Sequence, residues 1–334
     1  MRTRRAVADA WRTSGKNREN GLSKHMLIAL LGGGLSAVVA LAFLTGTPGA
    51  LFLAYLAPLP VLLVGLGFGV SVGTVAGGAG FLATVALGGM VTAGLYALVN
   101  AVPALVVVGT MLSQRTLSNG TRAWYPAGFT LCWLTALAAG LFTAAAFLAW
   151  SAGSGVVAAI SEFLDQVLAN MLPHVSSEKR SELVALMIPL FPGMVGASWI
   201  LMTAVNGALA QGILVRAGRN LRPSPRLVDL VLPDWMSWLL VASAAMALLG
   251  VGEWQYTGRN LALISAVPFF FLGMAVVHTL ASRVSFSGSL LVVIYFMLIF
   301  SNWAAGAAAG IGMIEQWAGL RYRFAGPNKR QGDE

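Results

Sequence analysis

Long stretches of the chain carry no charged side chain, and their lengths suit the thickness of a lipid bilayer. No Asp, Glu, Lys or Arg occurs between Met26 and Gln114. A helix needs about 20 apolar residues to cross a hydrocarbon core about 30 Å thick. Further charge-poor windows lie at Ala123–Ser161, Leu183–Val215, Trp235–Gly252, Asn260–Ser282 and Val284–Ile314. The pattern predicts an all-α, polytopic membrane protein with eight to nine transmembrane helices.

Turn residues divide these windows into individual spans. The cluster Thr45–Gly49 ends the first span, and a polar loop at Ser113–Trp124 follows the fourth. We expect eight full spans, at Met26–Leu44, Ala50–Leu66, Gly67–Leu87, Met90–Leu112, Pro126–Trp150, Ile188–Leu214, Trp235–Gly252 and Asn260–Ser282.

The last apolar stretch, Ser287–Leu320, is too short for two complete spans. It contains Asn302, Gly306, Gly310 and Gly312, which would let the chain reverse inside protein. We therefore expect a broken or re-entrant ninth element that returns the C-terminal tail to the cytoplasmic side. Nine full spans with an external tail is the alternative.

A segment between the fifth and sixth spans has a different pattern. From Val156 to Leu172 apolar residues recur at helical spacing, with Glu162, Asp165 and Gln166 between them. Pro173 and His174 interrupt this segment, and Ser177–Met187 has the pattern of a second short helix. We expect Val156–Leu172 to lie along the outer interface or over the external mouth rather than to cross the membrane.

Basic residues gather beside the spans and predict the orientation. Seven of the 21 Lys and Arg residues lie in the first 24 positions, and four more lie between Arg216 and Arg226. The positive-inside rule therefore puts the N-terminal tail, the Arg115–Arg122 loop and the Arg216–Arg226 loop in the cytoplasm, and the acidic insert outside. The predicted parts are a disordered basic tail (1–25), a six-span domain (26–214) with external helices at 155–187, a cytoplasmic loop (215–234), C-terminal membrane helices (235–320) and a basic tail (321–334).

Composition agrees with a membrane location. Hydrophobic residues make up 57% of the chain and charged residues 10%. The net charge of +9 does not favour nucleic acid as a partner, because the basic residues flank apolar spans where lipid headgroups are their usual neighbours. We expect a multi-pass protein of the bacterial inner membrane with the bilayer as its environment. Cys132, the only cysteine, excludes an intrachain disulfide.

Motifs of catalysis and metal binding are missing or out of place. No G-x-x-x-x-G-K-[ST] loop and no H-E-x-x-H sequence occurs, and the histidines are scattered at His25, His174 and His278. Gly69–Gly73 matches the nucleophile-elbow pattern around Ser71, but it lies in an apolar, glycine-rich span instead of a strand–turn–helix. We expect no enzymatic activity, no metal and no cofactor.

A few polar and aromatic residues inside the spans are candidates to line a cavity. Uncharged side chains of this kind orient ligands in apolar pockets, and His278 is the one histidine inside an expected span. The alternative is that the amides bond between helices and the tryptophans anchor at the interface. The candidate cavity residues are Asn100, Trp133, Trp199, Asn206, Gln211 and His278.

Small residues recur at intervals of four in the first three spans. Such a stripe lies on one helix face and lets another backbone approach closely. The stripe serves either packing inside the protein or docking of another subunit. The candidate helix-docking face consists of Ala29, Gly33 and Ala37 in the first span and Gly65, Gly69, Gly73 and Gly77 beyond it.

Two stretches carry a resemblance to a known family. The first runs from Asn206 to Gln211 and continues through an arginine-rich turn to Leu232-Pro233-Asp234-Trp235. The second is Gly312–Trp317, followed by Arg321-Tyr322-Arg323-Phe324. Over about Leu27 to Arg323 the chain resembles the YybS-like family of bacterial membrane proteins of unknown function.

The first six spans are also similar to the substrate-binding S subunits of energy-coupling-factor vitamin transporters. This likeness rests on Ala29, Gly33 and Ala37, and on Pro58-Leu59-Pro60 ahead of the glycines from Gly65 to Gly77. It implies ligand binding toward the external side, and a transmembrane coupling protein and ATPases as partners. The Val156–Met187 insert and the spans from the seventh onward are extra, and no vitamin-specific residue set is present.

Two functions follow from these features. The first is a transport-type protein that binds a small molecule among the fourth to sixth spans. The second is a non-catalytic assembly or envelope scaffold whose glycine faces and basic loops bind other membrane proteins. The first requires polar groups that converge in the interior, whereas the second requires exposed small-residue faces.

Overall fold

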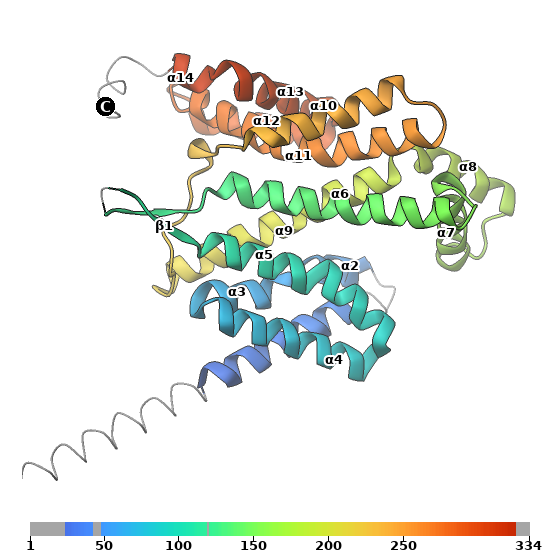
Figure 1. Cartoon of the computed structure of the whole chain (residues 1–334), viewed down its shortest axis with the longest axis horizontal. Helices are drawn as coiled ribbons and strands as arrows, with labels where there is room; N and C mark the ends of the chain where they lie inside the picture. The colour runs from blue at the N-terminus through green and yellow to red at the C-terminus, as the bar shows by residue number, and fades with distance from the viewer. Residues whose placement is uncertain (1–23, 43–47, 119, 325–334) are drawn as a thin grey trace, which may run out of the picture. The chain divides into compact units, whose positions relative to one another are not determined.

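The computed structural model describes residues 24–42, 48–118 and 120–324 (Figure 1). Nearly all of the described elements are helices, so the prediction of an all-α fold is confirmed. The first elements are the helix Lys24–Leu41, α2 (Pro48–Tyr55), α3 (Pro58–Phe68), α4 (Val70–Tyr96), the π-helix η2 (Ala97–Ala101), α5 (Val102–Met111), β1 (Gln114–Thr116), β2 (Arg122–Trp124) and α6 (Ala127–Ser151). The others are α7 (Val156–Met171), α8 (Ser177–Met187), η3 (Ile188–Leu190), α9 (Phe191–Arg216), η4 (Leu227–Asp229), α10 (Asp234–Leu249), α11 (Glu253–Ala281), α12 (Ser287–Phe300), α13 (Asn302–Ala318) and α14 (Leu320–Phe324).

The helices group into two compact units, and the two are described separately. Unit 1 contains the described residues of Met1–Tyr125 and Met202–Ser224. Unit 2 contains those of Pro126–Leu201 and Pro225–Glu334. Helix α9 begins in unit 2 and ends in unit 1.

The apolar helices are those of a polytopic membrane protein. Among the described residues, five helices are long and apolar enough to cross a membrane, and α12 with α13 makes a sixth if this bent pair is one span. The helices at the expected second and seventh spans, Phe52–Phe68 and Asp234–Leu249, are shorter. The membrane class is therefore confirmed, and the number of eight to nine full spans stays a prediction.

One of the five long helices, Val70–Met111, turns back on itself. Its 42 residues would extend about 63 Å at about 1.5 Å per residue, twice what a bilayer requires. At Gly89 the backbone leaves the helical region (φ 80°, ψ 174°), a conformation that suits glycine. Gly77 before this break faces Leu105 and Ala101 after it. The segments 70–88 and 90–111 thus correspond to the expected third and fourth spans.

The helix at the expected second span, Ala50–Leu66, contains a local interruption of its hydrogen-bond ladder. The chain breaks between α2 and α3, at Leu56 and Ala57. Pro58 has no N–H to continue the ladder, and the N–H of Leu59 donates to the carbonyl of Leu56 instead of that of Tyr55 (3.0 Å). The break leaves the carbonyl of Tyr55 available to another donor.

The polar segment Ser113–Trp124 is also more ordered than the expected loop. Strands β1 and β2 pair antiparallel, with Gln114 opposite Trp124 and Thr116 opposite Arg122. The N–H of Tyr125 donates to the carbonyl of Ser113 and closes the hairpin at its base (3.0 Å).

In unit 2 the core lies around α11. A buried cluster of Ala146, Val156 and Tyr256 joins α6, α7 and α11. Helices α10 and α11 are antiparallel, since Ser243 bonds Ser265 (3.1 Å) and Gly258 lies against the backbone of Ala247. Figure 1 shows the two helices side by side. Helix α11 starts at Glu253, two turns earlier than the expected eighth span.

The amphipathic insert forms the two expected helices, α7 and α8. The Glu253 carboxylate accepts a hydrogen bond from the N–H of Val156 at the start of α7 (2.8 Å). Arg180 of α8 pairs with Asp165 of α7 (Nε–Oδ1, 3.4 Å). The insert is thus attached to α11 at the start of α7, and its two helices are joined to each other by the Arg180–Asp165 pair.

The last membrane element is broken, as expected, but the break lies at Ser301, and Gly306, Gly310 and Gly312 are inside helix α13. Helices α12 and α13 meet at an angle of 116°. Because α11 runs antiparallel to α10, it ends near the level at which α10 begins. After α13, Arg321 donates to the carbonyls of Val228 and Leu230, a few residues before α10. The α12–α13 pair therefore leaves and returns at the same end of unit 2, and the expected re-entrant element stays a prediction.

Candidate functional site

The candidate cavity residues divide between the units. Asn100, Asn206 and Gln211 belong to unit 1, and Trp133, Trp199 and His278 belong to unit 2. Each group is built from helices of its own unit.

Asn206 of α9 binds the backbone at the break between α2 and α3. Its Nδ2 donates to the carbonyl of Tyr55 (2.7 Å) and to that of Met202 in its own helix (2.8 Å). The residue is 2% exposed, and its Oδ1 is buried without a hydrogen-bond partner in the described structure. Asn206 therefore presents a fixed and unsatisfied acceptor beside a broken helix.

A second set of polar contacts reaches the same interruption from the first helix and α4. Ser36 of the first helix donates to the carbonyl of Ala57 (2.6 Å), and Tyr96 donates from its hydroxyl to Ser36 Oγ (2.8 Å). All three residues are buried. We call Ser36, Tyr96, Asn206 and the backbone of Tyr55–Ala57 the break site. The sequence reasoning missed Ser36 and Tyr96, although Ser36 adjoins Ala37 of the small-residue stripe and Pro58 marks the break.

Asn100 lies inside the π-helical turn η2, four residues after Tyr96, and its side chain is buried. π-Helical turns widen a helix locally and often occur at functional sites. Pro103, which lacks an N–H, follows three residues later and suits the irregular backbone here.

Gln211 and Arg222 hold the arginine-rich loop against unit 1. Gln211 Nε2 donates to the carbonyl of Arg222 (2.7 Å), and Arg222 Nη1 donates to the carbonyl of Met111 (2.9 Å). The Arg222 guanidinium also lies 5.5 Å from the ring centroid of Trp124. Burial lowers the pKa of the Arg222 guanidinium from its ordinary value, which still leaves it charged. The Gln211 amide thus anchors a loop.

The three candidates of unit 2 have different surroundings. Trp133 is 51% exposed and contacts Trp235 at a ring distance of 6.4 Å. Trp199 is partly buried. His278 Nδ1 donates to the carbonyl of Met274 (2.8 Å), and Nε2 lies within hydrogen-bond distance of the Tyr295 hydroxyl (3.3 Å). His278 thereby joins α11 to α12.

Helices of the same chain cover most of the candidate helix-docking face. Ala29, Gly33 and Ala37 are buried, and a Cβ at Gly33 would overlap the carbonyl of Ala76. Gly73 contacts Gly65, and Gly77 contacts Leu105. Gly69 is partly buried and separates α3 from α4 with a φ of 103°. Within unit 1, the stripe residues thus lie against helices of the same unit, as the packing alternative requires.

The motif stretches that carried the family resemblance form contacts within each unit. Arg321 pairs with the buried Glu315 (Nε–Oε1, 2.7 Å), and Gln316 Nε2 donates to the carbonyl of Leu232 (3.3 Å). In unit 1, the stretch Asn206–Gln211 provides the Asn206 amide, which binds the carbonyl of Tyr55, and the Gln211 amide, which binds the carbonyl of Arg222. These residues fasten the loop 217–233 to the helices.

Asn260 is a buried amide that the sequence reasoning did not select. Its Nδ2 donates to the carbonyls of Pro189 (3.2 Å) and Tyr256 (2.9 Å), and its Oδ1 accepts from the N–H of Gly193 (2.8 Å). It satisfies the backbone where prolines interrupt the start of α9. The sequence predicted that this span begins at Asn260. The residue was therefore expected at a helix end, whereas it lies inside α11.

Comparisons with known proteins identify a family. No curated protein and no solved structure matches the chain, and the similarity to S subunits of energy-coupling-factor transporters is not shown. The family model described as "Predicted membrane protein (DUF2232)" matches residues 34–315. The expected membership of a membrane-protein family of unknown function is confirmed: this chain belongs to the DUF2232 family of predicted membrane proteins.

Proposed function

We propose that the protein is a small-molecule binding component of the membrane, of the transport type, and that the break site of unit 1 holds its ligand. The observation that carries the proposal is the buried Oδ1 of Asn206, which has no partner among the described residues. No catalysis by this chain is part of the proposal.

The geometry of Asn206 supports a ligand that donates a hydrogen bond. Both protons of Nδ2 are used by the carbonyls of Tyr55 and Met202, so Oδ1 has one fixed direction. An unsatisfied buried acceptor costs about 1–3 kcal/mol, which a ligand N–H or O–H would recover.

The broken helix supports the same assignment. In transporters, binding sites lie where membrane helices are discontinuous, because the interrupted backbone provides polar groups at depth. Here the interruption at Pro58 leaves the carbonyl of Tyr55 without its helical donor, and Asn206 binds it, while Ser36 donates to the neighbouring carbonyl of Ala57. Since residues 26–114 contain no charge, the proposed ligand is neutral.

Thermal stabilisation tests the proposal. A ligand of the folded state raises the apparent melting temperature, so the purified full chain is screened against vitamins, nucleosides and lipids. We expect a stabilising ligand whose effect disappears in Asn206→Ala and weakens in Asn100→Ala.

Asn260→Ala is the matched control, because Asn260 is a buried amide with both ends bonded inside unit 2. It should lower the melting temperature and leave the ligand-induced shift unchanged. Equal ligand shifts in wild type and Asn206→Ala would contradict the break site as the binding site. No stabilisation by any ligand would favour the scaffold role, with other membrane proteins as partners. A coupling protein and ATPases belong to the proposal only if the chain is a transporter component.

A further inference from the structure

All charged residues described in unit 1 are basic. Its described residues include no Asp or Glu. They include six basic residues, namely Lys24, Arg115, Arg122, Arg216, Arg219 and Arg222. Unit 2, by contrast, contains all three ion pairs found among the described residues.

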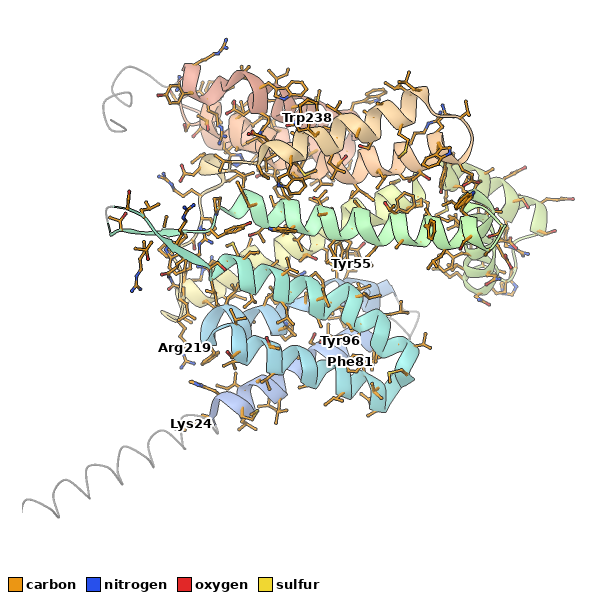
Figure 2. All side chains as sticks on the ribbon, in the orientation of Figure 1. Lys24, Tyr55, Phe81, Tyr96, Arg219 and Trp238 are labelled. Carbon is orange, nitrogen blue, oxygen red and sulfur yellow. The ribbon has the colours of Figure 1, made fainter. Side chains whose placement is uncertain are left out.

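A chain of contacts places these basic residues at one end of unit 1. His25, next to Lys24, has its ring 5.4 Å from that of Phe68 at the end of α3. The neighbouring Gly67 lies against Leu214, two residues before Arg216. Figure 2 shows Lys24 and Arg219 at the same end.

The β-hairpin belongs to that end as well. Arg222 bonds the carbonyl of Met111 at the end of α5, and its guanidinium lies over Trp124 of β2. Arg115 and Arg122 therefore lie within the same group of loops, on β1 and β2.

Five of the six basic side chains are exposed, and the sixth is structural. Lys24, Arg115, Arg122, Arg216 and Arg219 are exposed, and we call these five the basic end. Arg222 is 6% exposed and fixes the loop that carries its neighbours. The exposed Leu117 and Leu221 flank these residues with apolar surface.

We propose that the basic end binds the phosphate headgroups of anionic phospholipids. Several guanidinium groups without a carboxylate in the same unit attract phosphate, which accepts paired N–H donors from arginine. The end adjoins apolar helices, so its natural occupant is a molecule with a phosphate and acyl chains. Anionic lipids attract basic segments next to membrane helices in this way. The inference does not depend on the proposed ligand of the break site.

Lipid titration of the full chain in detergent tests the proposal. The probes are phosphatidylglycerol and phosphatidylcholine with the same acyl chains, and bound lipid is counted by native mass spectrometry. We expect phosphatidylglycerol to bind more tightly, with an affinity that falls as salt rises from 50 to 200 mM. In Arg216→Gln/Arg219→Gln the affinity should fall about 25-fold, from about fivefold per arginine near an anionic surface.

Arg283→Gln/Arg323→Gln is the matched control, since it removes two exposed arginines from unit 2. Its affinity should stay within about twofold of the wild type. If Arg216→Gln/Arg219→Gln fails to fold, Arg115→Gln/Arg122→Gln tests the same surface on the hairpin. Equal binding of the two lipids, or an equal loss in the control, would overturn the proposal.

Discussion

Gly273 of α11 and Gly312 of α13 are reciprocal contacts: a Cβ at Gly273 would overlap the carbonyl of Ala308, and a Cβ at Gly312 would overlap that of Phe269. Each glycine therefore leaves room for the backbone of the other helix. Close backbone approach of this kind is how membrane helices pack without a hydrophobic driving force between them. The contact holds α13 against α11, the longest described helix of unit 2.

Substitution of either glycine should separate these helices. We expect Gly312→Leu to destabilise the protein by about 3 kcal/mol, the upper part of the range for overpacking, because the obstacle is backbone rather than a flexible side chain. The measurement is the unfolding free energy in detergent. Gly310→Ala on the same helix is the control, since a Cβ there meets open space. Equal stability of the two variants would contradict the contact.

The ion pair between Arg321 and Glu315 should be far more important than the pair between Arg226 and Asp229. Glu315 has a side-chain exposure of 6%, and Arg321 also satisfies two loop carbonyls. Removing one partner of a buried pair costs about 3–5 kcal/mol, so Arg321→Gln should be strongly destabilising.

Arg226→Gln provides the comparison. Its Nε–Oδ2 distance to Asp229 is also 2.7 Å, but the side chains are 75% and 54% exposed. A surface pair contributes about 0–1 kcal/mol. Thermal unfolding of both variants decides the point, and similar losses would show that burial does not set the strength of these pairs.

Glu253 should control the order of α7. Its carboxylate accepts from the N–H of Val156 at the helix N-terminus, where a negative charge is favourable. In Glu253→Gln we expect faster hydrogen exchange at the start of α7, corresponding to about 1 kcal/mol of local stability. Glu162→Gln, within α7, should leave this exchange unchanged. The same exchange in both variants would exclude the contact as an anchor.

Cysteine labelling tests the orientation in a Cys132→Ala background. A membrane-impermeant thiol reagent added outside should label Ser177→Cys and not Ser118→Cys, because the basic loops are expected in the cytoplasm. Both serines are exposed. Labelling of Ser118→Cys alone would invert the orientation.

The same method tests the re-entrant pair. Arg321 bonds the segment before α10, so Tyr322→Cys should be labelled from the same side as Ser224→Cys. Labelling of the two cysteines from opposite sides would favour a ninth full span.

The membrane helices and most of their breaks follow from the sequence alone. Apolar length and the amphipathic period of Val156–Leu172 are local properties, and the structure has long apolar helices and α7 at those places. The bend after Ser287 was expected, but it lies at Ser301 rather than at the glycines. Pro58 is likewise a local signal, and the hydrogen-bond ladder is interrupted directly before it. Such signals act over a few residues, so they need no knowledge of the partner helix.

Tertiary structure decided which surface each small or polar residue meets. Gly33 lies against Ala76, and Asn206 binds the carbonyl of Tyr55, 151 positions away in the sequence. A glycine stripe suits an internal helix and a separate subunit equally well, and an amide pairs with any freed carbonyl. The choice depends on which helices come together, and that is set by the packing of the whole unit rather than by local pattern.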